Sequence, residues 1–325
     1  MSGGASSSGT AAARPHAWRS AAADRIVEGA IRGVGADIAA LRIPKLGGVV
    51  LGGGYGRGEG GVFEGPEAGG VRLSNDLDFY VVSEEGVSAR ELDAIGAALE
   101  PVGEKWTAAL GVDVDFCVRT PWRLRHDQER MMVQELVRGF FDVAGRSGDE
   151  LFRGVERRAP EALPWSEAVR LMMNRGAGLL WAKEEGRDAN FVVRNLVKCI
   201  LGAGDARLVA RGEYRWAAEE RGKALGDALY AKALAWKFRP DAAGVCDWET
   251  ARAVWLAAAE EVRARGRSER KVFHAARWIA RRGTVGEWRT FALDPVVRIF
   301  RAMERTIRER KPFPDALRKD WAVFN

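Results

Sequence analysis

The 325-residue sequence predicts an α+β fold, in which a mixed sheet flanked by helices is followed by an all-α region. In the first third of the chain, short runs of strand-forming residues alternate with helical segments. From about residue 122, long stretches rich in Ala, Leu, Arg and Trp follow with helical periodicity. We therefore expect a disordered tail at 1–14, a domain containing the sheet at 15–121 and a helical domain at 122–325.

The elements of the first domain can be placed in chain order. Residues 1–14 are mostly Gly, Ser and Ala, which offer little apolar surface to bury, so they predict the tail. The expected elements are a helix at 18–38, strands at 49–51, 75–82 and 111–118, and a helix at 89–99. Gly and Pro between positions 64 and 72 predict a flexible loop, and Pro121 ends the domain.

A glycine-rich turn follows the first expected strand, at residues 52–59. Backbone N–H groups of glycines can approach a phosphate that a side chain would push away. The turn lacks the Lys-Ser or Lys-Thr ending of a P-loop, and no βαβ unit with a ribose-binding acid follows it. The candidate phosphate-binding residues, with Arg57 assisting the backbone amides, are Gly53, Gly54, Tyr55, Gly56 and Arg57.

Two acidic residues, Asp76 and Asp78, stand two positions apart in the second strand run. Side chains at alternate strand positions leave the same face, about 7 Å apart. Two carboxylates placed in this way can hold a shared cation, although an Asp-x-Asp alone is also typical of a solvent-facing strand. Asp76 and Asp78 are thus candidate catalytic and metal-binding residues.

The third strand run supplies a further acid, either Asp113 or Asp115, which share one face. We favour Asp115 as the third catalytic and metal-binding residue, because residues 115–118 repeat the local pattern of residues 78–81. Asp113 remains the alternative. The combination of strand, glycine turn and two acidic strands is more specific than any of these motifs alone.

These motifs resemble the nucleotidyltransferase superfamily that includes DNA polymerase beta and many small bacterial transferases. The string Gly-Gly-Tyr-Gly-Arg-Gly-Glu at 53–59 is especially similar to the bacterial uridylyltransferases that modify nitrogen-regulatory proteins, as is the segment 118–120. Tyr55 stands where many superfamily members have Ser. The resemblance covers roughly residues 22–125.

The resemblance implies transfer of a nucleoside monophosphate from a nucleoside triphosphate, with ATP the expected one, to an acceptor hydroxyl. It also implies two Mg²⁺ or Mn²⁺ ions and release of pyrophosphate. The uridylyltransferases are much longer and carry a metal-dependent hydrolase domain. This chain has three histidines, too few for that hydrolase, so His126-Asp127 is interpreted as a surface dipeptide.

The helical domain offers a candidate polar stripe in the segment 191–209. Helical spacing places Arg194, Lys198 and Asp205 on one side, with Asn195 beside them. In many small nucleotidyltransferases the helical domain lends polar residues to the nucleotide, so Asn195 and Lys198 are candidate nucleotide-binding residues. The alternative is an ordinary amphipathic helix with its polar face in water.

The composition limits the partners. A net charge of +6 is small for 325 residues, and Arg alternates with Glu and Ala in the helical segments, which is typical of a solvated face. We therefore expect a small-molecule or protein acceptor rather than nucleic acid. An RNA-end transferase and a catalytically silent binding module are the alternatives.

The expected location of the chain is the cytoplasm. Its apolar runs are too short or too interrupted to span a membrane, and no basic region followed by a hydrophobic stretch opens it. The three cysteines are isolated, without the paired spacing of zinc ligands, and are interpreted as packed thiols.

Overall fold

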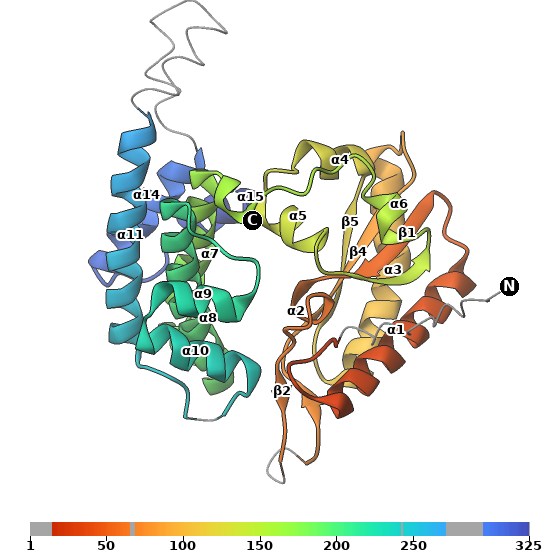
Figure 1. The fold of residues 1–325 in the computed structure, drawn as a ribbon, viewed down its shortest axis with the longest axis horizontal. Helices are drawn as coiled ribbons and strands as arrows, with labels where there is room; N and C mark the ends of the chain where they lie inside the picture. The colour runs from red at the N-terminus through yellow and green to blue at the C-terminus, as the bar shows by residue number, and fades with distance from the viewer. Residues whose placement is uncertain (1–14, 66–68, 242, 271–294, 325) are drawn as a thin grey trace, which may run out of the picture. The chain divides into compact units, whose positions relative to one another are not determined.

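The computed structural model describes residues 15–65, 69–241, 243–270 and 295–324 (Figure 1). The tail expected at 1–14 lies outside the described residues, as do positions 66–68 of the loop expected at 64–72. Among the helices of the described ranges, none combines the length and the apolar character that crossing a membrane requires.

The chain forms two compact units. The sheet unit comprises the described residues up to Val118 together with Gly139–Leu151, and the helical unit comprises Arg119–Arg138 and the described residues from Phe152 onward. The backbone therefore passes between the units three times, after residues 118, 138 and 151.

The sheet unit is built on a four-stranded sheet with the order β5-β4-β1-β6. Its strands are β1 (Leu46–Leu51), β4 (Leu77–Ser83), β5 (Val114–Arg119) and β6 (Phe141–Gly145). The central strand β1 pairs antiparallel with both neighbours, and Leu51 lies opposite Phe79 on one side and Phe141 on the other. A separate two-stranded ribbon joins β2 (Val62–Phe63) to β3 (Arg72–Leu73).

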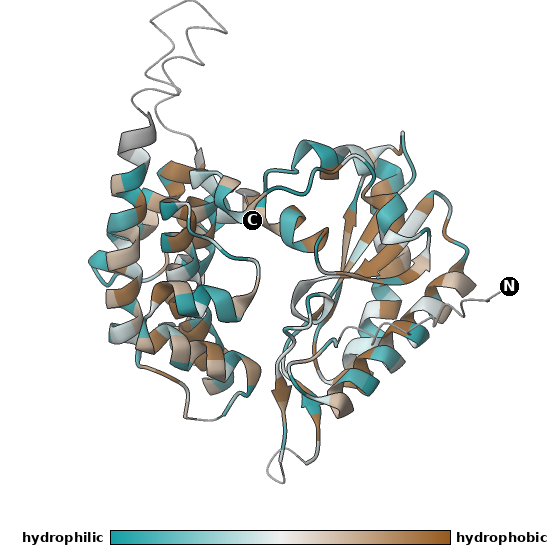
Figure 2. Cartoon of the chain, in the orientation of Figure 1, coloured by the Kyte–Doolittle hydropathy of each residue, from teal (hydrophilic) through white to brown (hydrophobic). Residues whose placement is uncertain are grey.

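Two long helices of the sheet unit share its apolar core, α1 (Ala21–Leu41) and α3 (Ala89–Leu110). Ser20 caps α1 by accepting a hydrogen bond from a backbone N–H, and Ser88 and Glu91 form a capping box on α3. In Figure 2 the strands are largely brown, whereas α1 alternates teal and brown, as expected for a helix with one buried side. Two short helices complete the unit, α2 (Gly53–Gly56) and α6 (Gly148–Leu151).

The helical unit has its own apolar core, centred on the neighbouring helices α7 and α8. Met172, Cys199 and Trp255 are fully buried there. Its elements are α4 (Pro121–His126), α5 (Met131–Leu136), a 3₁₀ turn (Pro160–Ala162), α7 (Trp165–Trp181), α8 (Ala189–Arg211), α9 (Ala218–Leu225), α10 (Ala228–Phe238), α11 (Trp248–Arg270), α14 (Pro295–Arg308) and α15 (Asp315–Phe324). The predicted α+β fold class, with a helical C-terminal part, is confirmed.

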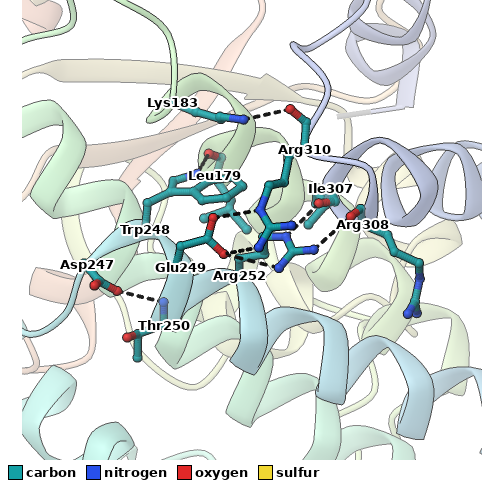
Figure 3. Close-up of polar contacts among 10 residues, drawn as sticks. All are labelled: Leu179, Lys183, Asp247, Trp248, Glu249, Thr250, Arg252, Ile307, Arg308 and Arg310. Carbon is teal, nitrogen blue, oxygen red and sulfur yellow. Dashed lines mark hydrogen bonds and ion pairs between the residues drawn. The ribbon is translucent and has the colours of Figure 1, made fainter.

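Two charged side chains of α11, Glu249 and Arg252, bind the C-terminal end of α14 and the residues that follow it (Figure 3). Arg252 of α11 donates from Nε to the carbonyl oxygen of Ile307 at 2.9 Å and from Nη2 to that of Arg308 at 2.8 Å. Glu249 binds Arg310 through two hydrogen bonds, of 2.9 and 3.1 Å. Because the last carbonyls of a helix lack partners within it, a guanidinium there both satisfies them and complements the helix dipole.

Candidate active site

The glycine turn and the second strand acid lie in direct contact. The N–H of Gly52 donates to the carbonyl oxygen of Asp78 at 2.9 Å. Gly53 has a φ of +61°, and a Cβ at this position would overlap the Asp78 carboxylate, standing 2.9 Å from its carbon atom. The site therefore requires glycine at position 53 for two reasons, the backbone conformation and the space.

The turn itself is a single helical turn, α2, that starts at Gly53 directly after β1. The N–H of Gly56 donates to the carbonyl oxygen of Gly52 at 2.8 Å, which closes the turn. The first amides of a helical turn have no partner within it, so those of Gly53 and Gly54 are donors beside the Asp78 carboxylate. An anion brought to these amides would be repelled by Asp78 unless a cation lay between them.

Tyr55 belongs to the core rather than to the surface of the turn. Its side chain is buried, and its hydroxyl donates to the carbonyl oxygen of Gly61 at 2.7 Å and accepts from the N–H groups of Ser74 (3.2 Å) and Asn75 (3.4 Å). A Cβ at Gly60 would overlap the tyrosine ring. The Tyr55 side chain thus fixes the segment that leads into β4, and only its backbone remains to meet a ligand.

Asn75 adds a second tie to the same segment, because its Oδ1 accepts a hydrogen bond of 2.7 Å from the N–H of Gly61. Asp76 follows immediately and is half-buried. Tyr55 and Asn75 therefore hold the backbone directly before Asp76 against Gly61. Asn75 was not among the sequence candidates, although it opens the Asn-Asp-Leu-Asp motif.

The third strand brings its acids to the same region. The N–H of Leu77 donates to the carbonyl oxygen of Asp113 at 2.8 Å, which joins the start of β4 to the residue before β5. Burial raises the pKa of Asp115, and the negative charges of Asp113 and Asp76 raise it further. Asp115 is therefore close enough to Asp113 and to Asp76 to be repelled by both, and Asp78 stands two residues from Asp76.

Stacked aromatic rings align the two acidic strands. Phe79 of β4 and Phe116 of β5 lie 5.4 Å apart between ring centroids. Each phenylalanine directly follows an acid, Asp78 and Asp115, so alternation sends the acids to the face opposite the rings.

The donor set fits a hard divalent cation, because carboxylate oxygens are the ligands that Mg²⁺ prefers and mutual repulsion between carboxylates is relieved by such an ion. Within the described ranges, however, no three His, Cys, Asp or Glu side chains are arranged as a ready metal site.

Arg57 is held by a buried partner. Its Nε lies 3.6 Å from Oε2 of Glu59, whose side chain is 9% exposed. A Cβ at Gly139 would lie 3.0 Å from Cα of Arg57 and would overlap its side chain. Arg57 thus forms an ion pair with Glu59. Glu59 belongs to the glycine-rich motif but was not among the sequence candidates.

Asn195 and Lys198 belong to the helical unit and are half-buried on α8. The Asn195 side chain donates from Nδ2 to the carbonyl oxygen of Phe191, one turn earlier, at 2.9 Å. A Cβ at Gly178 of α7 would overlap its Oδ1. Asn195 therefore takes part in the packing of α7 against α8.

The expected polar stripe on α8 needs a correction at Asp205. This residue does not face solvent, because its Oδ1 accepts a 2.6 Å hydrogen bond from the Tyr230 hydroxyl and lies 3.0 Å from Nε of Arg221. The side chains of Arg221 and Asp205 are 5% and 15% exposed. Burial raises the pKa of Asp205, and the charge of Arg221 opposes that rise. Asp205 is half of an interior ion pair.

The sequence and the structure were compared with those of known proteins. No protein-family model and no curated protein matches the sequence. Among solved structures, spectinomycin adenyltransferase AAD(9) from Enterococcus faecialis, crystallised with ATP and spectinomycin, is similar over 74% of this chain and 97% of that chain. The two sequences are 13% identical and the TM-score is 0.36, values too low to assign a family.

Proposed function

We propose that this protein is a metal-dependent nucleotidyltransferase, which moves a nucleoside monophosphate from a nucleoside triphosphate, expected to be ATP, to an acceptor hydroxyl. The observation that carries the proposal is the contact between Gly53 and Asp78. This contact supports the proposal because it brings a glycine turn next to a carboxylate, and backbone amides and carboxylates are the kinds of group that bind phosphate and Mg²⁺.

The acids have distinct roles in this proposal. Asp76 and Asp78 hold Mg²⁺ or Mn²⁺ together with Asp115, or with Asp113 in its place. The bound ions supply charge neutralisation for the triphosphate and for the departing pyrophosphate. The backbone amides of residues 53–56 donate to the phosphate oxygens.

Asp115 is also the proposed proton acceptor. A carboxylate within hydrogen-bond reach of the acceptor hydroxyl can act as its general base. The acceptor hydroxyl gives its proton to this carboxylate, and its oxygen forms a bond to the α-phosphorus. The bond from that phosphorus to the bridging oxygen breaks, and the electron pair leaves with pyrophosphate.

The proposed acceptor is a small molecule or a protein side chain. Lys198 is proposed as a counter-charge to the triphosphate, because an ammonium is a compact cation suited to phosphate. Asn195 is proposed as a nucleotide contact through its carboxamide, whose Nδ2 already donates to Phe191.

The test uses α-labelled ATP, GTP, CTP and UTP in turn, with Mg²⁺ or Mn²⁺ and a cell extract. Wild type is compared with Asp76→Asn/Asp78→Asn and with a control, Asp93→Asn/Glu100→Gln, which removes two exposed acids of α3. The proposal is supported if wild type and the control transfer label to a component of the extract and the Asp76/Asp78 variant does not. The labelled component is then the acceptor. Equal transfer by the Asp76/Asp78 variant, or no transfer by any form, overturns it. In the second case, capture of a partner from the extract would favour a silent binding module.

A further inference from the structure

The outer face of α14 carries a row of arginines. Arg298, Arg301 and Arg305 are exposed and are spaced by three and four residues, which places them on one side of the helix. Among the described residues, their side chains form no hydrogen bond or ion pair. Arg308 continues the row by one further turn.

The opposite side of α14 is committed to the core of the helical unit. Val296, Ile299, Phe300, Met303 and Ile307 are all at most 3% exposed. The helix therefore has no apolar side chain left for a membrane, which an interfacial helix needs in order to insert.

Acidic residues next to the row are already paired. Glu304, the one acid within α14, is 6% exposed and lies 3.0 Å from Nη2 of Arg308 and 3.5 Å from Nη1 of Arg263. Glu309, just beyond the helix, lies 2.7 Å from Nζ of Lys311. The hydrogen bond from Lys311 lowers the pKa of Glu309 and the charge of Arg305 lowers it further, so the charge of Arg305 is partly compensated within the protein. Arg298 and Arg301 form no ion pair with an acid of the described residues and remain open to an external partner.

The basic character of the whole chain is concentrated in this part of the sequence. Between positions 263 and 311 lie 15 of the 51 Lys and Arg residues but five of the 45 Asp and Glu residues, a net charge of +10. The remainder of the chain has a net charge of −4. The overall +6 thus conceals a strongly basic segment in an otherwise acidic protein.

We propose that the arginine row of α14 (Arg298, Arg301 and Arg305) binds the phosphodiester backbone of a nucleic-acid strand. A guanidinium binds phosphate through two parallel hydrogen bonds and keeps its charge at every physiological pH. The helical rise spaces the three arginines about 4.5 Å and about 6 Å along the axis, so they can meet successive phosphates.

Two observations favour nucleic acid over an acidic protein. The row lacks the aromatic or aliphatic side chains that form the centre of most protein–protein interfaces. It has instead the polar, positively charged character of nucleic-acid interfaces. Contacts to the backbone alone carry no sequence information, so binding is independent of base sequence and of the 2′-hydroxyl.

The test measures fluorescence anisotropy of a labelled 20-nucleotide oligouridylate with the full chain over a range of salt concentrations. Arg298→Gln/Arg301→Gln/Arg305→Gln is compared with a control of equal charge change, Arg25→Gln/Arg32→Gln/Arg90→Gln. The control removes three exposed arginines of the sheet unit whose side chains also form no hydrogen bond or ion pair among the described residues.

Wild type and control are expected to bind with steep salt dependence, and oligodeoxythymidylate is expected to bind equally well. The α14 variant should bind more weakly, and its slope of log K against log salt should be smaller in magnitude by about 2, which is about 0.7 for each lost phosphate contact. Asp76→Asn/Asp78→Asn should bind as wild type does, which separates this surface from the transferase site.

Three outcomes overturn the proposal. Equal weakening in the α14 variant and the control would attribute binding to net charge alone. Full binding by the α14 variant would place the site elsewhere. Binding to anionic phospholipid vesicles or polyglutamate but not to the oligonucleotides would assign the row to a different class of partner.

Discussion

Gly53 leaves room for the carboxylate of Asp78, since a Cβ on Gly53 would stand 2.9 Å from the Asp78 carboxyl carbon and would overlap its Oδ2. A residue of the turn and a residue of β4 therefore constrain each other directly. Any side chain at position 53 must displace the acid, the turn or both.

Gly53→Ala is expected to lower activity and stability together. Alanine at a φ of +61° is unfavourable by about 1–2 kcal/mol, and the added methyl group pushes Asp78 from its position. The matched control is Gly111→Ala after α3, because Gly111 has a similar φ of +68° and no atom lies within 4 Å of a Cβ there. Urea unfolding and label transfer check both variants, and equal behaviour of the two would contradict the proposed contact.

Tyr55→Phe is expected to destabilise the sheet unit by about 0.5–1.5 kcal/mol, because it removes the hydrogen bonds of the buried hydroxyl to Gly61, Ser74 and Asn75. The loss is limited because the Ser74 N–H also donates to the Gly61 carbonyl oxygen at 3.1 Å. The ring still fills its place beside Gly60, so packing is retained. Denaturant unfolding measures the loss. An unchanged midpoint would show that the hydroxyl does not hold the segment before Asp76.

Asp115→Asn is expected to stabilise the metal-free protein at neutral pH. Burial and the charges of Asp113 and Asp76 raise the pKa of Asp115 in the folded state. The folded state therefore binds this proton more tightly than the unfolded state, so stability falls as pH rises from the unfolded pKa through the folded one. Asparagine removes that loss, by less than about 1 kcal/mol because the group is partly exposed.

The check on Asp115→Asn is urea unfolding in EDTA, at pH 7 and at the lowest pH at which the chain stays folded. The gain should shrink at acid pH, where the aspartate is protonated in both states. Asp93→Asn, at an exposed position of α3, serves as the control and should change nothing. A gain of the same size at both pH values would refute the electrostatic cause.

Arg252→Ala is expected to lower the stability of the helical unit by about 1–3 kcal/mol. It removes two charge-assisted hydrogen bonds from the last carbonyls of α14, those to Ile307 and Arg308 (Figure 3). Arg298→Ala, which removes an arginine with no such bond, is the control. The melting temperature should fall for Arg252→Ala and remain at the wild-type value for Arg298→Ala.

Elements whose signal lies within a few consecutive residues were predicted from the sequence. The glycine turn after a buried strand and the alternating acids of β4 and β5 are short-range signals. In contrast, β6 consists of five residues, and its apolar–polar alternation is limited to Phe141, Asp142 and Val143, which is too short to predict a strand. They form a strand because β1 offers its free edge to them, a long-range effect.

The same limit explains the error at Asp205 and the hidden role of Tyr55. Helical spacing gives the direction of Asp205 around its own helix, but its partners Arg221 and Tyr230 come from elsewhere in the chain. Likewise, the motif identifies Tyr55, whereas the bonds of its hydroxyl to Gly61 and to the residues before β4 exist only in the folded chain.

Because the backbone passes between the units three times, the first 121 residues do not contain the whole sheet unit. A fragment ending there would lack β6 and leave β1, an inner strand of the sheet, with an edge of unpaired backbone N–H and C=O groups. Such an edge pairs readily with another chain. In the sequence, α4 and α5 lie between β5 and β6. A single recombination point in the gene therefore cannot separate the sheet unit from the helical unit.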